Sequence, residues 1–240
     1  MKIKAVFFDL DGTLLPMEQK DFLKAYLGGL SKVLGTKGYE PDSVISAIWH
    51  STADMVKNDG IKTNEEVFWN SFSSILGEDV RKEEPLLDEF YRTDFQEVKN
   101  ACGFAPEAKE IISMLHDANI TTVLATNPLF PAIATESRIR WAGLDPEDFA
   151  IYTTYEKSRY CKPNPEYYKS LLDKLDLKGE ECVMVGNDVA EDMIAQDLGM
   201  QVFLLTDDLI NKTNEDIPHY KNGSFFELKK YIEELINENN

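Results

Sequence analysis

Near its start the chain has a short apolar run, Ala5 to Phe8, which ends abruptly in the polar cluster Asp9-Leu10-Asp11-Gly12-Thr13. An unbroken apolar run of this length is typical of a strand buried on both faces of a sheet. Such a strand, over residues 4–8, would deliver two acids to its carboxyl end. Four later apolar runs have the same character and predict further strands at 120–125, 149–153, 182–185 and 202–205.

Helical patterns separate the later strands. Apolar residues share one helical face over 108–115 and again over 168–175. Asn164-Pro165 has the form of an N-cap followed by proline at the first helical position. A further helix is predicted over 189–198, with Gly199 as its stop signal.

Strands that alternate with helices of this length predict an α/β fold, a doubly wound, Rossmann-like sheet. Its strands should be mainly parallel, joined by right-handed crossovers, and covered by helices on both faces. In sheets of this kind ligands bind at the carboxyl ends of the strands. Three of the five predicted strands end in polar residues there, so we expect the functional site at that edge.

The alternation breaks between residues 17 and 98, which contain helical patterns and no convincing strand. One of these helices should begin at Thr63, because Thr63 and Glu66 have capping-box spacing. The predicted architecture is therefore an α/β catalytic core, residues 1–16 and 99–240, with an inserted α-helical cap at 17–98. We expect the cap to determine substrate specificity.

Charge and composition exclude several classes of partner. With 43 acidic and 25 basic side chains the net charge is −18, so the average field repels nucleic acid polymers and anionic membranes. No apolar stretch could span a bilayer, and the first apolar run is too short for a signal-peptide core. We expect a cytoplasmic protein, a monomer or a homodimer, whose three widely spaced cysteines are reduced thiols.

Asp9 and Asp11 carry the first chemical signal. Residues two apart in a strand point to the same face, and the turn at Gly12 leaves both acids at its exposed end. Two such carboxylates repel each other unless a cation lies between them or one of them keeps its proton, as a general acid does. Oxygen ligands favour Mg²⁺. The alternative is an Asp-Gly turn with two solvated acids.

The segment DLDGTLL at residues 9–15 resembles the phosphatase signature of the haloacid dehalogenase superfamily. Three further family motifs follow in order and at strand ends. Thr126 matches the family's Ser or Thr, Lys162 opens a segment similar to Lys-Pro-x-Pro, and Gly186-Asn187-Asp188 takes the place of the acidic metal-binding motif. The resemblance spans most of the chain and favours a phosphatase of the phosphoglycolate phosphatase or β-phosphoglucomutase type, with its cap after the first strand.

By this resemblance the chain is a magnesium-dependent phosphomonoester hydrolase acting on a small phosphorylated metabolite. Asp9 would attack phosphorus to form an aspartyl-phosphate, and Asp11 would act as general acid and then general base. Lys162 would neutralise the phosphate and the nucleophile. Mg²⁺ would be held by Asp9, by the backbone carbonyl of Asp11 and by Asp188. The substrate would contact Asp9, Leu10, Asp11, Thr126, Asn127 and Lys162.

Position 187 departs from the family pattern, because the fourth motif most often begins Gly-Asp and here carries Asn187. The carboxylate comes one residue later, so we assign Asp188 to the metal and treat Asn187 as a neutral neighbour. Asp192, four residues further on, could contribute to the metal site, cap a helix or pair with Lys162.

Other functions share these motifs. A phosphomutase of the β-phosphoglucomutase type has the same core and differs in how its cap excludes water. Dehalogenases of the family lack the second acid, which is present here as Asp11, and phosphonate hydrolysis would need a cap lysine that forms an imine. A non-catalytic module that binds a phosphorylated ligand is a further alternative, although both Asp9 and Lys162 are retained.

Overall fold

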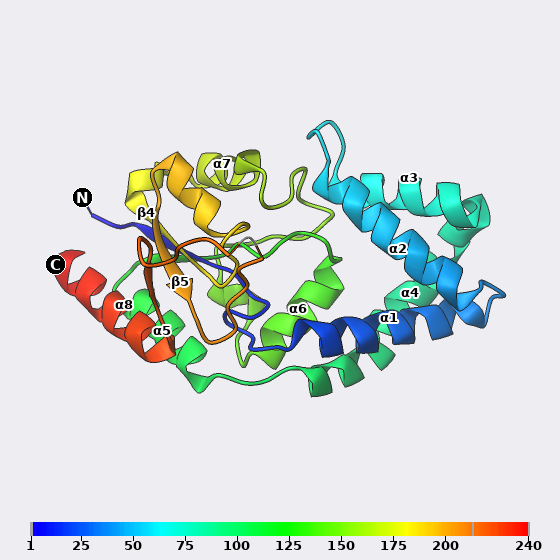
Figure 1. Cartoon of the computed structure of the whole chain (residues 1–240), viewed down its shortest axis with the longest axis horizontal. Helices are drawn as coiled ribbons and strands as arrows, with labels where there is room; N and C mark the ends of the chain where they lie inside the picture. Colours follow the sequence, from blue (N-terminus) through cyan, green and yellow to red (C-terminus); the bar gives the residue numbers. More distant parts are fainter. Residues whose placement is uncertain (1, 213, 240) are drawn as a thin grey trace.

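The computed structural model describes residues 2–212 and 214–239 and contains a parallel sheet with strand order β3-β2-β1-β4-β5-β6 (Figure 1). The predicted α/β fold class is confirmed. All five predicted strands are present, and the structure adds a sixth at the edge of the sheet. The strands are β1 (Ala5–Phe8), β2 (Thr121–Leu124), β3 (Ile151–Tyr152), β4 (Cys182–Gly186), β5 (Gln201–Leu205) and β6 (Lys221–Gly223).

Alternate side chains of β1 enter two separate hydrophobic cores, as the pleat of a strand requires. Val6 and Phe8 belong to one core, and Ala5 and Phe7 belong to the other. The first core is covered by α5 (Pro106–Asp117), α6 (Ala132–Trp141) and α8 (Phe225–Asn239). The second is covered by α7 (Pro165–Leu175) and the 3₁₀ helix η5 (Met193–Leu198). Because both faces of β1 are buried, its whole run must be apolar.

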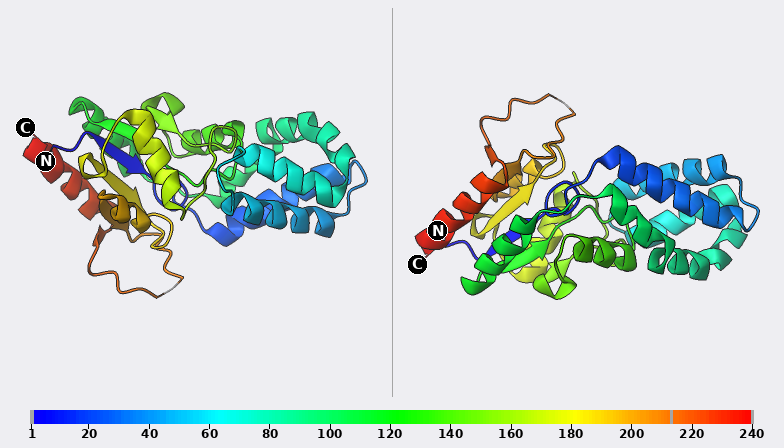
Figure 2. Two further views of the ribbon diagram at one scale, coloured as in Figure 1. Left: turned by 90° about the horizontal axis from the view of Figure 1, so that it is seen from above. Right: turned by 90° about the horizontal axis from the view of Figure 1, so that it is seen from below.

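The segment after β1 is helical, and Figure 2 shows it as a separate layer of helices beside the carboxyl ends of the strands. Its helices, which we call the cap, are α1 (Gln19–Gly35), α2 (Pro41–Val56), α3 (Asn64–Leu76), η1 (Glu78–Glu83), α4 (Glu84–Arg92) and η2 (Asp94–Ala101). Within the cap α1 packs against α2, and α2 packs against α3.

Hydrogen bonds at both ends of the cap hold it against the core. The entering and leaving chain segments lie side by side, because the amide of Gly103 donates to the carbonyl of Pro16 at 2.7 Å. At the other end the buried side chain of Asn64, at the start of α3, donates to the carbonyl of Pro128 at 3.3 Å. Thr63 caps the same helix through the predicted capping box with Glu66.

Three details differ from the sequence-based expectations. The strand β6 was not predicted, because its residues are polar and at least partly exposed. Residues 189–198, predicted as one helix, form a turn followed by η5. The side chain of Asp192 accepts a hydrogen bond from the amide of Asp188, which holds the first part of this segment in a turn and not in a helix. The last long cap helix ends at Arg92, whereas the apolar pattern predicts a helix over 86–95. In the described residues no helix is both long and apolar enough to cross a membrane.

Candidate active site

The candidate site forms where the carboxyl ends of three neighbouring strands meet. β1 lies between β2 and β4, and Phe8 is in register with Leu124 on one side and Val185 on the other. The first residues after these strands therefore lie at the same level. As a result Asp9 comes close to Thr126 and to the Gly186-Asn187-Asp188 segment, although they are more than a hundred residues apart in sequence.

Lys162 completes this arrangement from the loop before α7. Its side chain is 1% exposed, and its ammonium group contacts the carboxylate of Asp9 at 2.7 Å and that of Asp192 at 2.6 Å. Burial lowers the pKa of Lys162, but the carboxylates of Asp192 and Asp9 outweigh that effect and raise the pKa well above its usual value. Lys162 is therefore a buried cation shared by two acids.

Among the described residues, Asp9 shares its one contacting cation, Lys162, with Asp192. Burial raises the pKa of the Asp9 carboxyl to about 8, and the neighbouring Asp192 and Asp11 act in the same direction, against the opposing ammonium of Lys162. A carboxyl in this environment gains from any further cation placed beside it.

Asp11 lies beside Asp9 and forms an ion pair that the sequence did not indicate. Its Oδ2 accepts a hydrogen bond from Nη1 of Arg138, a fully buried residue of α6. The guanidinium also donates to the hydroxyl of Thr135 at 3.3 Å and lies 4.3 Å from the centre of the Phe130 ring. The other carboxylate oxygen of Asp11, Oδ1, is buried without a hydrogen-bond partner among the described residues. Arg138 thus holds one oxygen of Asp11 and leaves the other free.

We expect Arg138→Met to lower the free energy of unfolding by about 3 kcal/mol, because it leaves a partly buried carboxylate without its cation. Arg140→Met in the same helix is the matched control. Arg140 is 56% exposed and pairs with Glu136 at 3.5 Å, so its loss should cost under about 1 kcal/mol. Urea unfolding of both variants measures the difference, and equal costs would contradict the importance of the buried pair.

In the fourth motif, the side chain of Asn187 is used in hydrogen bonds within the protein, whereas Asp188 keeps one carboxylate oxygen toward the cavity. Asn187 is fully engaged, because its amide donates to the carbonyl of Asp208 at 2.7 Å and its oxygen accepts from the hydroxyl of Thr13 at 3.1 Å. It lies so close to Gly12, which has φ 84°, that a side chain at position 12 would collide with it. Asp188 accepts two backbone amides with Oδ1, while its Oδ2 lies 3.9 Å from the exposed Lys212.

Asp192 has a positioning role in the described structure. Besides pairing with Lys162, it accepts a hydrogen bond from the backbone amide of Asp188 at 2.9 Å. A side chain at Gly186 would collide with it, so the glycine permits its close approach. Of the three roles considered for Asp192, the structure shows the pairing with Lys162.

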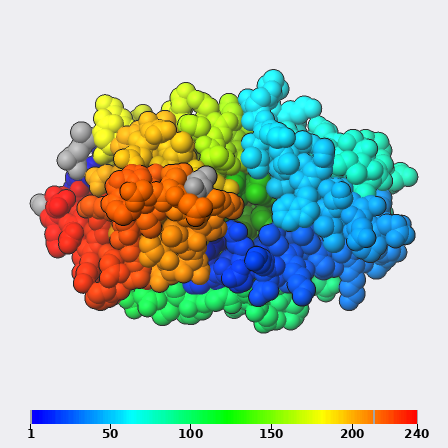
Figure 3. Space-filling view, viewed as in Figure 1, coloured from blue at the N-terminus to red at the C-terminus, as the bar shows by residue number. Residues whose placement is uncertain are grey.

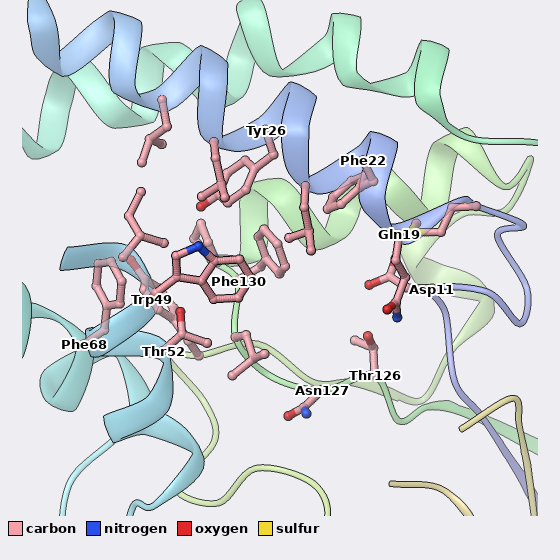
Figure 4. Close-up of a pocket in the computed structure, with 18 of the residues that line it drawn as sticks. Asp11, Gln19, Phe22, Tyr26, Trp49, Thr52, Phe68, Thr126, Asn127 and Phe130 are labelled. Atoms are coloured by element: carbon pink, nitrogen blue, oxygen red, sulfur yellow. The ribbon is translucent and has the colours of Figure 1, made fainter. Parts of the chain in front are cut away.

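The remaining predicted residues also lie at this edge. Thr126 is buried, and Figure 4 shows its side chain beside the same cavity as Asp11. Asn127 donates to Glu191 at 2.9 Å and accepts from the amide of Lys162 at 3.3 Å, so it ties two loops of the site together. Leu10 is buried, and its carbonyl accepts the amides of Thr13 and Leu15 in the turn after β1.

The donors and charges here fit a bound cation. Among the described residues, five carboxyl groups lie at this site with two buried cations, Lys162 and Arg138, and one carboxylate oxygen of Asp11 has no partner; the acids are Asp9, Asp11, Asp188, Glu191 and Asp192. In the described part of the chain no three His, Cys, Asp or Glu side chains form a metal-binding group. The predicted ligand set does not require one, because it combines two carboxylates with a backbone carbonyl.

A cavity of about 370 Å³ leads from these acids into the cap. Figure 3 shows its mouth as a hollow between the cap helices, in blue and cyan, and the orange segment of the core. The core end is polar, with Asp9, Asp11 and Thr126, whereas the cap end is lined mainly by aromatic and aliphatic side chains. Neither this lining nor the role of Arg138 was predicted from sequence. Apolar residues at helical spacing usually indicate a hydrophobic core, and the sequence of a helix does not show which of its arginines is buried.

Known proteins resemble the chain in sequence and in fold. The chain is 28% identical over 208 residues to a phosphoglycolate phosphatase from Vibrio parahaemolyticus, over 85% of this chain and 84% of that protein. It is 26% identical over 187 residues to the pyrophosphatase PpaX of Bacillus cereus, over 78% of this chain and 76% of that protein.

A solved structure of a 2-haloacid dehalogenase from Pseudomonas syringae has the same fold, with a TM-score of 0.62, 18% identity, and coverage of 97% of this chain and 99% of that one. The model of a family described as haloacid dehalogenase-like hydrolases matches residues 3–199. Since this match extends over most of the chain, from β1 to the end of η5, the protein belongs to the haloacid dehalogenase-like hydrolases.

Proposed function

We propose that this hydrolase is a magnesium-dependent phosphatase that cleaves a phosphate monoester through an aspartyl-phosphate on Asp9. The observation that carries the proposal is the buried contact between Asp9 and Lys162, at the end of a cavity that also exposes Asp11. A carboxylate held by a buried ammonium group is placed to approach a phosphate dianion, since Lys162 offsets the negative charge that both of them carry. Two of the similar proteins named above are phosphatases, in agreement with this chemistry.

The chain supplies both proton and nucleophile. In the first step a carboxylate oxygen of Asp9 bonds to phosphorus while the bond from phosphorus to the ester oxygen breaks, and Asp11 gives its proton to that oxygen. In the second step Asp11 takes a proton from water, whose oxygen displaces Asp9 and releases inorganic phosphate. Arg138 positions Asp11 through Oδ2, so that Oδ1, which has no partner among the described residues, is the oxygen that exchanges a proton with the ester oxygen and with water.

The second acid also bears on the alternative chemistries. In a dehalogenase the leaving group is a halide ion, which needs no proton, so Asp11 would have no role as a general acid and Arg138 would have no general acid to position. We therefore favour the phosphatase over a dehalogenase, although both share the fold.

Mg²⁺ would be held by Asp9, by the backbone carbonyl of Asp11 and by Asp188. When bound, the ion would screen the nucleophile from the phosphate and neutralise the charge that develops on its oxygens. In this proposal Lys162, Thr126 and the backbone amides that follow Asp9, starting with Leu10, bind the other phosphate oxygens.

Phosphate release should require the metal. We expect hydrolysis of p-nitrophenyl phosphate to fall by at least about 100-fold when EDTA removes divalent ions, and to return on addition of Mg²⁺ but not of K⁺. Activity that is unaffected by EDTA would contradict the metal assignment. Conversion of one phosphosugar isomer into another without phosphate release would show a phosphomutase, and binding of phosphorylated ligands without turnover would show a non-catalytic module.

A further inference from the structure

The cap end of the cavity is an aromatic wall, which we define by Phe22, Tyr26, Trp49, Phe68, Trp69 and Phe130. Figure 4 shows Phe22, Tyr26, Trp49, Phe68 and Phe130 around one open space, with Asp11 and Thr126 at its far side. The rings support one another, since the centroids of Tyr26 and Phe130 lie 5.1 Å apart and those of Phe22 and Phe130 lie 6.1 Å apart. Phe22, Tyr26 and Phe130 therefore pack as one cluster of rings.

The wall has few polar atoms, the hydroxyl of Tyr26 and the indole nitrogens of Trp49 and Trp69, and among the described residues Nε1 of Trp69 is buried without a hydrogen-bond partner. The hydroxyls of Tyr26 and Tyr91 bond to each other at 3.0 Å in a buried position, so both residues present carbon to the cavity. Trp49 is the most exposed residue of the wall, because half of its surface is exposed. A tryptophan that lines a cavity and stays half exposed gains by covering its ring with an apolar ligand.

The charged residues that line the cap end of the cavity disfavour a second anionic group on the substrate. Among the lining residues that the structure describes there is no Arg or His, and the single Lys, Lys212, has a side chain 73% exposed beside Asp188. The cap contributes two acids to the lining, Glu84 and Asp88. A second anionic group on the substrate would find no buried cation in the cap and would be repelled by these carboxylates.

We infer that the organic group of the substrate is hydrophobic, an alkyl or aryl group without a charge, rather than the carboxylate of phosphoglycolate or the second phosphate of pyrophosphate. The inference rests on the proposed phosphatase function and specifies its substrate class. Phosphate occupies the polar end at Asp9 and Lys162, and the ester carbon chain lies along the aromatic wall. The cavity volume of about 370 Å³ lies within the usual range for sites that enclose an organic ligand.

A series of n-alkyl phosphates from ethyl to octyl tests the inference, because all members have nearly the same leaving alcohol and differ in buried length. We expect kcat/KM to rise about fourfold for each methylene until the cavity is filled. Hexyl phosphate should exceed both phosphoglycolate and pyrophosphate by at least about 100-fold. A flat or falling series, or a preference for phosphoglycolate or pyrophosphate, would overturn the inference while leaving the phosphatase function intact.

Two variants locate the effect in the wall. Trp49→Ala should lose at least about tenfold in kcat/KM for octyl phosphate and reduce the increment per methylene, as expected for a smaller apolar surface. Phe226→Ala, which removes a 63% exposed aromatic residue of α8 outside the lining, should keep the wild-type series. Thermal unfolding of both variants checks that they fold. An unchanged series in Trp49→Ala would contradict the role of the wall.

Binding measured without turnover separates the two proposals. Quenching of tryptophan fluorescence by alkylphosphonates, which have no ester bond to cleave, should give dissociation constants that fall with chain length. If no ester releases phosphate but the dissociation constants fall with chain length, the proposed phosphatase function is wrong and the binding of a hydrophobic group by the aromatic wall is supported. If esters are cleaved and the dissociation constants do not depend on chain length, the inference of a hydrophobic substrate group is wrong.

Discussion

Asp9→Asn is expected to lower kcat for phosphate release by about 10⁴-fold or more, because the carboxamide cannot form the aspartyl-phosphate. The side chain keeps its size and can still accept a hydrogen bond from Lys162, so the site should keep its shape. Release of inorganic phosphate from p-nitrophenyl phosphate in Mg²⁺ measures the loss. Asp173→Asn, at an exposed position of α7, is the matched control and should retain wild-type activity. Substantial turnover by Asp9→Asn would exclude Asp9 as the nucleophile.

The same substitution should increase stability in the absence of metal. The folded-state pKa of Asp9, about 8, lies above its ordinary value of 3.8. Between these values the folded protein keeps a proton that the unfolded chain releases, so the contribution of Asp9 to stability decreases as pH rises from about 4 to about 8. Asp9→Asn removes this dependence. Its midpoint of thermal unfolding in EDTA should exceed that of the wild type at pH 8, and the difference should shrink toward pH 4.

Lys162→Met should be the most destabilising of the substitutions considered, at about 3–5 kcal/mol of unfolding free energy, since it leaves Asp9 and Asp192 buried without their shared cation. We also expect phosphate release to fall by at least about 10³-fold, because the charge that offsets phosphate and nucleophile is lost. Urea unfolding and a phosphate-release assay measure the two effects on the same preparation.

A double-mutant cycle with Asp192→Asn assigns the cause. The cost of Lys162→Met comes from two unpaired acids, so removing one of them in the double variant should recover about 1–3 kcal/mol. The activity should not return, because Lys162 remains absent. Strictly additive losses of stability would show that Lys162 and Asp192 act independently, contrary to their 2.6 Å contact.

The fold and the positions of the main polar residues could be predicted from sequence because they follow from short-range patterns. A strand buried on both faces needs an unbroken apolar run, and parallel strands bring their carboxyl ends to one edge. These rules were enough to place Asp9, Thr126 and Asp188 at that edge. The resemblance to the family then pointed to Lys162, which lies far from the end of a strand in the long loop between β3 and α7.

Long-range packing determined the rest. Arg138 and Arg140 are two residues apart in one helix, yet one is fully buried on Asp11 and the other is solvent-exposed. Which helical face turns inward depends on what packs against it, and local periodicity does not contain that information. The aromatic wall arose in the same way. Five of its six residues lie on cap helices at the spacing of ordinary core residues, and they line a cavity because the cap helices leave a space at the carboxyl ends of the strands.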